Sequence, residues 1–115
     1  MPRTTRSAQA NIATGARIAL VRHALGLSQE ALAAQLAIGR SAVANWEKGT
    51  READVGRMTR LCELYGVTLD YIYRGSLVGL PHELYRAIEE RQPEAAGLAE
   101  DPAPFQASQN VTKRR

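Results

Sequence analysis

The stretch that decides the fold runs from residue 22 to residue 49 and reads RHALGLSQEALAAQLAIGRSAVANWEKG. Ser28 has the side chain of a helix N-cap, and apolar residues then recur at helical spacing up to residue 36. A break of three residues ends at Gly39, and a second helical pattern continues to Gly49. Two short helices separated by so tight a break must cross steeply.

Helical spacing also flanks this pair on both sides. Apolar residues recur on one face from residue 12 to about residue 24, and two later periodic segments end at Gly66 and Gly75. No segment alternates apolar and polar residues as a half-buried strand would. The sequence therefore predicts an all-α domain of five helices over residues 12–75.

Three segments lie outside this predicted domain. Residues 1–11 are polar and basic without periodicity, which predicts a flexible basic arm. Residues 76–91 are predicted to form an amphipathic helical extension, a sixth helix that Pro81 can open. Residues 92–115 are rich in Pro, Ala, Glu, Gln and Ser, and this composition predicts a disordered tail.

Length and charge limit the classes of protein to which the chain can belong. Its 115 residues suffice for one small core, and no apolar run approaches the ~20 residues of a membrane-spanning helix. Residues 1–75 carry ten Lys and Arg against six Asp and Glu, whereas residues 76–112 carry two against six. The net positive charge of residues 1–75 indicates an anionic partner, whereas residues 76–112 have a net negative charge.

The chain has few residues that could carry out chemistry. Cys62 is the single cysteine, which excludes an internal disulfide and favours a reducing compartment such as the cytoplasm. Two His and one Cys are too few for a zinc site with four His or Cys ligands in one chain. The sequence shows no Gly-rich phosphate loop and no Ser–His–acid pattern. We therefore expect neither enzymatic activity, nor a cofactor, nor a metal site.

The pattern resembles the helix-turn-helix domains of the phage repressor and Cro type, often called XRE-like, over about residues 14–75. The resemblance implies a five-helix DNA-binding domain whose third helix enters the major groove. It is carried by Arg22, by residues 27–33 (LSQEALA), by residues 43–49 (VANWEKG) and by residues 64–71 (LYGVTLDY).

The resemblance also implies roles for particular residues. The positions that would contact bases are Arg40, Ser41, Ala44 and Asn45. Gln29 matches a position that holds a DNA phosphate in the family, and the amides at the starts of the second and third helices suit a phosphate as well. From their charge, Lys48, Arg51 and Arg17 are also expected to contact DNA phosphates. Arg22 and Glu47 would form a buried ion pair, and Trp46 is expected in the core. The chemistry agrees, because Arg can donate twice to guanine and Asn can pair with adenine.

The sequence departs from the family pattern in the turn between the second and third helices. The family has a glycine there, and this chain has Ala37. Alanine in a left-handed conformation costs about 1–2 kcal/mol, so we expect a reshaped turn and a different pose of Arg40. The segment 50–54 also lacks the proline common in the family.

Sequence-specific binding of a double-stranded DNA operator by a homodimer, and transcriptional repression, is the function that the resemblance implies. The expected dimer surface is made by Tyr71, Tyr73, Leu80, Leu84 and Tyr85. One alternative is an antitoxin of the same fold, which would bind a basic toxin partner through the acidic segment from residue 83 to residue 101. Another is an imported organellar protein, since the first 29 residues are acid-free and contain several Arg.

Overall fold

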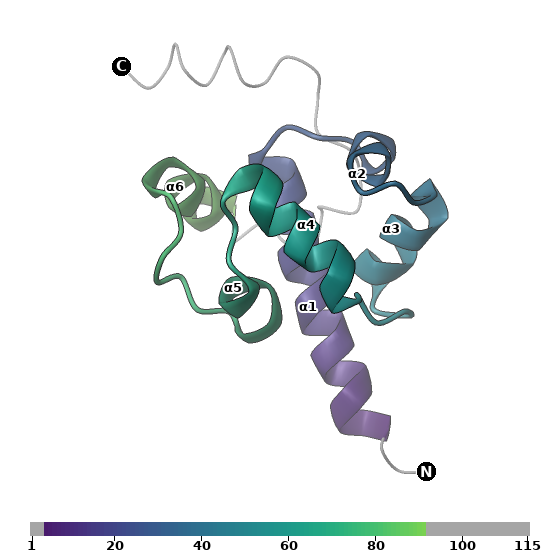
Figure 1. Cartoon of the computed structure of the whole chain (residues 1–115). Helices are drawn as coiled ribbons and strands as arrows, with labels where there is room; N and C mark the ends of the chain where they lie inside the picture. The colour runs from purple at the N-terminus through teal and green to yellow at the C-terminus, as the bar shows by residue number, and fades with distance from the viewer. Residues whose placement is uncertain (1–3, 92–115) are drawn as a thin grey trace.

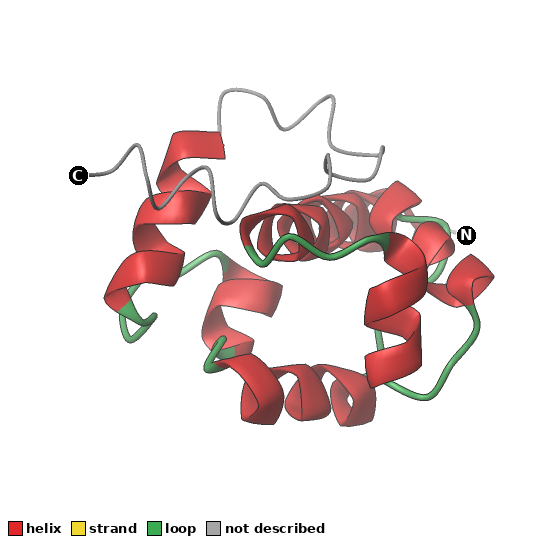
Figure 2. Ribbon diagram, turned by 90° about the horizontal axis from the view of Figure 1, so that it is seen from above, coloured by secondary structure: helices red, strands yellow, loops and turns green. Residues whose placement is uncertain are grey.

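The computed structural model describes residues 4–91, and within this range every regular element is a helix (Figure 2). The helices are α1 (Thr4–Ala24), α2 (Gln29–Gln35), α3 (Arg40–Lys48), α4 (Val55–Tyr65), α5 (Leu69–Arg74) and α6 (His82–Arg91). The prediction of an all-α fold with a short C-terminal helix is confirmed. The tail predicted for residues 92–115 lies outside the described residues.

Helix α1 is the element around which the others are arranged (Figure 1). Helices α3, α5 and α6 each pack against α1, and α2 packs against α3. Figure 1 shows α2 and α3 on one side of α1, α5 and α6 on the other, and α4 across the front. The α2–α3 pair is therefore held against one side of a long helix.

Three of the helices are capped at their N-termini by the side chain of the N-cap residue. Ser28 accepts a hydrogen bond from the backbone amide of residue 31 at 3.0 Å, as its position predicts. Asp54 and Thr68 do the same for α4 and α5, each at 2.9 Å. Each cap satisfies one of the amides that a helix start leaves without an intrahelical partner.

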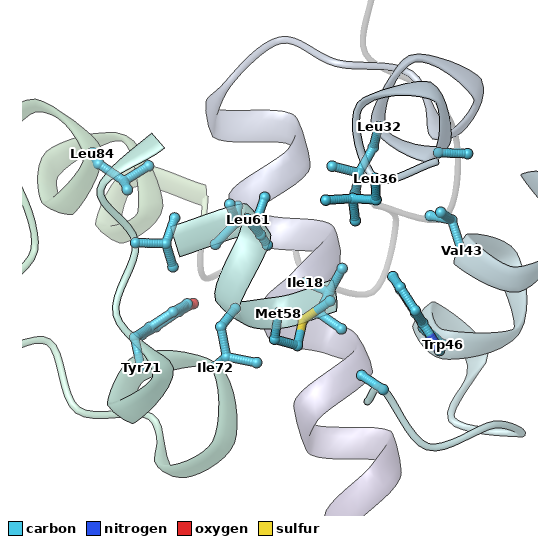
Figure 3. Close-up of a cluster of buried hydrophobic side chains, with 14 of the residues drawn as sticks. Ile18, Leu32, Leu36, Val43, Trp46, Met58, Leu61, Tyr71, Ile72 and Leu84 are labelled. Carbon is cyan, nitrogen blue, oxygen red and sulfur yellow. The ribbon is translucent and has the colours of Figure 1, made fainter. Parts of the chain in front are cut away.

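The hydrophobic core consists of apolar side chains of α1 and of the helices that surround it (Figure 3). Trp46 is 1% exposed, which confirms that it belongs to the core. Other fully buried side chains come from α1, α2, α3, α4 and α5; among them are Ile18, Leu32, Val43, Met58, Leu61 and Ile72. One apolar cluster therefore joins all five helices.

The sixth helix belongs to the same core. Leu84 and Ile88 are 7% and 0% exposed, and α6 packs along α1. Tyr71 is likewise 2% exposed. The expectation that Tyr71 and Leu84 form a dimer surface is therefore wrong, because both side chains are already covered by their own domain. The amphipathic pattern of the extension reflects folding within the chain.

The beginning of α1 differs from the sequence prediction. Residues 4–11, predicted as an irregular arm, are helical, although residues 8–10 are exposed. Figure 1 shows this end of α1 extending beyond the other helices. Residues 8–10 are exposed, so no apolar periodicity is required of them. Neither Gly nor Pro interrupts the chain between Thr4 and Thr14, so the helix continues outward.

Helices α1 and α3 approach each other unusually closely at two glycines. A Cβ atom on Gly15 would overlap the carbonyl oxygen of Trp46 and lie 2.9 Å from that of Glu47. At the end of α3, Gly49 has a φ of +81°, and a Cβ there would lie 2.6 Å from the side chain of Ile12. The last turn of α3 thus rests directly on the backbone of α1.

The turn between α2 and α3 keeps its left-handed residue even though that residue is alanine. Ala37 has a φ of +60°. The amide of Ile38 donates to the carbonyl of Ala33 at 3.0 Å and that of Ala37 donates to Ala34 at 3.3 Å, which is the Schellman pattern. The expectation of a reshaped turn is wrong, because these bonds and the half-buried Ile38 hold the turn in place despite the steric cost.

We expect Gly15→Ala to lower the free energy of unfolding by about 2–3 kcal/mol, because the added methyl group has no room against α3. Gly56→Ala is the matched control, since Gly56 is also helical but its Cβ would make only an ordinary contact at 3.4 Å. That control should gain about 0.5–1 kcal/mol. Urea denaturation of the two variants would contradict the close approach if they changed stability alike.

We expect Ala37→Gly to raise the free energy of unfolding by about 0.5–1 kcal/mol, because glycine adopts a positive φ without steric cost. Ala34→Gly, at an exposed position within α2, should instead destabilise by a similar amount. Thermal denaturation of both variants measures the difference. A loss of stability in Ala37→Gly equal to that in Ala34→Gly would show that residue 37 is not left-handed.

Candidate nucleic-acid interface

Helix α3 has one outward face and one inward face. Ala42, Val43 and Trp46 are buried on the inward face. The expected base-contacting residues and the lysine that follows them share the other face, at relative positions that helical geometry places together: Arg40, Ser41, Ala44, Asn45 and Lys48. Arg40, Ser41 and Lys48 are exposed, and Ala44 and Asn45 are half-buried. The structure thus gathers all five on a surface open to a large ligand.

The side chain of Asn45 is held by a residue that sequence reasoning did not single out. The hydroxyl group of Thr50 lies 3.3 Å from both Oδ1 and the carbonyl oxygen of Asn45. Thr50 stands just after the glycine that ends α3, where a hydroxyl can reach back to the last turn. In the sequence, the spacing of five residues between Asn45 and Thr50 is the signal that could have indicated this contact. Thr50 restricts the orientation of the Asn45 amide before any ligand binds.

The start of α3 carries no side-chain cap. Its N-cap residue, Gly39, has an extended conformation and makes no capping hydrogen bond through a side chain. The first amides of α3 therefore rely on other partners, and the positive end of the helix dipole favours an anion there. Arg40 and Ser41 follow immediately, so this end of α3 combines amides, a hydroxyl and a guanidinium.

Two of the residues expected to contact phosphates are exposed near the opposite end of α3. Lys48 occupies its last turn, and Arg51 follows in the loop before α4. Both side chains are exposed, long and flexible, so they are able to reach an anionic backbone.

Arg17 does not belong to this surface. Its Nη1 atom donates to the carbonyl oxygen of Ile72 at 3.1 Å, and its guanidinium lies against Gly75 at the end of α5. Helix α5 is on the other side of α1 from α3 (Figure 1). The expectation of a phosphate contact is wrong, because the carbonyl groups at a helix C-terminus attract the cation.

Arg22 and Glu47 form a buried ion pair between α1 and α3. Arg22 Nε lies 2.7 Å from Glu47 Oε2, and Arg22 Nη2 lies 3.0 Å from Oε1. The side chains are 0% and 4% exposed. Arg22 Nη1 also donates to the carbonyl oxygen of Leu27 at 2.9 Å. The guanidinium thus joins α1 both to α3 and to the loop that leads into α2.

Gln29 turns inward toward this pair. It is 6% exposed, and its Nε2 atom donates to Glu47 Oε1 at 3.0 Å. That its side chain also holds a DNA phosphate stays a prediction. A buried carboxylate needs several donors, and the Gln29 amide supplies one in addition to those of Arg22.

The remaining sequence features add no chemistry in the described residues. Between residues 4 and 91 no cluster of His, Cys, Asp and Glu could hold a metal ion. No helix in that range has the length and apolar character needed to cross a membrane. Burial raises the pKa of the Cys62 thiol, with a further contribution from Glu63, which disfavours the reactive thiolate.

A family model described as helix-turn-helix matches residues 18–72, which extend from α1 to α5. No significant match was found among curated proteins or among solved structures. The matched segment contains the buried ion pair, the left-handed turn and the outward face of α3. Residues 18–72 thus form a helix-turn-helix domain of the phage repressor and Cro type, a family of DNA-binding regulators.

Proposed function

We propose that this protein binds double-stranded DNA sequence-specifically and regulates transcription as a repressor, by inserting α3 into the major groove. The observation that supports it most strongly is the two-faced character of α3. Val43 and Trp46 fix the inward face in the core, while Arg40 and Asn45 are presented on the other face. A helix held in this way can enter a groove without rearranging the domain.

Each outward residue has a matching chemistry in the major groove. Arg40 can donate two hydrogen bonds to the O6 and N7 atoms of guanine, and Asn45 can pair with adenine at N6 and N7. Ala44 offers a methyl group to the methyl group of thymine, and Ser41 can donate or accept. We therefore expect G, A and T within each half-site.

The proposed phosphate contacts surround this reading face. Lys48 and Arg51 lie on one side, and the uncapped first amides of α3 lie at its other end. Such contacts fix the register of the helix along the groove and make binding depend on salt, but they do not read sequence. The Gln29 side chain at the start of α2 is proposed to add a phosphate contact besides its hydrogen bond to Glu47.

We further propose that the protein binds as a homodimer on a twofold-symmetric operator, with half-sites about one helical turn apart. The apolar loop between α5 and α6 supports this. Val78 is 81% exposed, and Leu77 and Leu80 beside it are half-buried. Of the tyrosines first expected there, Tyr73 donates to the carbonyl oxygen of Ala53 and Tyr85 to Glu89, and both keep partly exposed rings.

An antitoxin that binds a basic toxin and represses its own operon is the second candidate. The outer face of α6 favours it, since Glu83, Glu89 and Glu90 are all exposed. The rest of the acidic segment, up to residue 101, lies outside the described residues. Co-purification of a small basic protein, lost when the three glutamates are replaced by Gln, would support this candidate.

Selection of bound duplexes from a random pool tests the proposed DNA binding. At about 150 mM salt the wild-type protein should enrich a palindromic sequence. The Arg40→Ala/Asn45→Ala variant should lose that enrichment, because each base contact contributes about five- to 150-fold in affinity. Arg60→Ala removes an exposed charge from α4 and should retain the motif. Weak binding without enrichment, equal in the wild type and the double variant, would contradict the proposal.

A further inference from the structure

We infer that Tyr73 is a positioning residue for the loop between α3 and α4, and that through this loop it sets the phosphate contact proposed for Arg51. This assignment rests on the proposed function, because it concerns how a cation of the loop is presented to DNA. It gives a role to a hydroxyl group on α5, a helix that makes none of the proposed contacts with DNA.

The loop between α3 and α4 is held at its two ends by its own residues. At the start, the amide of Thr50 donates to the carbonyl oxygen of Asn45 at 3.0 Å. At the end, Asp54 caps α4 by accepting from the amide of Arg57 at 2.9 Å. In the part of the chain that the structure describes, the amides of residues 51–53 donate no hydrogen bond. The middle of the loop therefore depends on a restraint from elsewhere.

Tyr73 supplies that restraint from α5. Its hydroxyl group donates to the carbonyl oxygen of Ala53 at 2.9 Å, which is within the usual range for a hydroxyl donor. Ala53 is 6% exposed, and the half-buried ring of Tyr73 packs against the hydrophobic core. Figure 1 shows α5 and α3 on opposite sides of α1. The hydrogen bond thus ties the loop that follows α3 to the other side of the domain.

The Tyr73 hydroxyl group keeps the proton that this contact needs. Burial raises the pKa of Tyr73, and the negative charges of Asp54, Glu52 and Cys62 raise it further. A carbonyl oxygen is only an acceptor, so a protonated phenol is the form that matches it. The contact is therefore present at the neutral pH at which DNA binding is measured.

Arg51 lies two residues before the carbonyl group that Tyr73 holds. Its side chain is exposed, and between residues 4 and 91 it forms neither a hydrogen bond nor an ion pair. The backbone of the loop alone therefore decides where the guanidinium can reach. A loop released from Tyr73 would have more conformations to lose on binding, which weakens a phosphate contact made by Arg51. Because phosphates carry no sequence information, operator and random duplexes should be affected alike.

A double-mutant cycle tests this coupling on the full chain, with Tyr73→Phe, Arg51→Ala and the double variant. Phenylalanine keeps the ring packed but cannot donate to Ala53. We expect Tyr73→Phe to weaken binding of both operator and random duplex by about threefold to tenfold, which corresponds to one neutral hydrogen bond. Arg51→Ala should make the slope of log K against log salt shallower by about 0.9, the contribution of one phosphate. Adding Tyr73→Phe to Arg51→Ala should change neither quantity further.

Tyr85→Phe is the matched control. Tyr85 is also half-buried and donates through its hydroxyl group, to Glu89 at 3.1 Å within α6. It was expected at the same dimer surface as Tyr73, so an effect on dimerisation would appear in both variants. We expect Tyr85→Phe to leave the affinity and the salt slope unchanged, because its hydroxyl group does not contact the loop.

The outcomes separate this inference from the proposed function. If the wild type selects an operator but Tyr73→Phe weakens binding equally with and without Arg51, the inference is overturned and the proposed function stands. Equal losses in Tyr73→Phe and Tyr85→Phe would overturn it as well. If the wild type binds duplexes without selecting an operator, sequence-specific binding fails, and the same cycle on a random duplex still tests the role of Tyr73. If no duplex is bound, both proposals fail.

Discussion

The buried ion pair between Arg22 and Glu47 is the constraint on which the rest of the structure depends. Two charges removed from water are stable only where donors and acceptors are matched, so the pair admits one arrangement of the helices that supply it. Here the Arg22 guanidinium joins α1 to the loop before α2 and to the last turn of α3. Gly15 allows a close approach of the two helices, because its lack of a side chain lets α3 contact the backbone of α1.

Function follows from what this arrangement leaves exposed. The core takes Val43 and Trp46 from one side of α3, and the other side presents guanidinium, hydroxyl, methyl and amide groups to solvent. A rigidly supported helix loses little conformational entropy when it binds, so its side chains can discriminate between bases. The turn at Ala37 supports this arrangement as well. Its left-handed conformation is sterically unfavourable for alanine, but it sets the crossing angle between α2 and α3.

Sequence alone predicts the helices, the buried Trp46 and the face of α3, because helical periodicity and capping are local signals. It fails where the outcome depends on which partner a polar side chain finds in three dimensions. Arg17 has the features of a surface cation in the sequence, but α5 provides a carbonyl group that binds it. The hydrogen bond from Gln29 to the Glu47 carboxylate likewise has no signal in the sequence. The helical conformation of residues 4–11 was not predicted because exposed helical residues, such as residues 8–10, show no apolar periodicity.

The outward face of α3, held by the buried ion pair, is the surface that we propose contacts DNA. An NMR titration of the isotope-labelled protein with the selected duplex tests it most directly. We expect the largest chemical-shift changes at Arg40, Ser41, Asn45 and Lys48, while the Arg22 side-chain N–H signals stay protected from exchange. If the duplex binds and the signals of Arg40, Ser41 and Asn45 do not shift, that result would contradict a DNA contact by the outward face of α3.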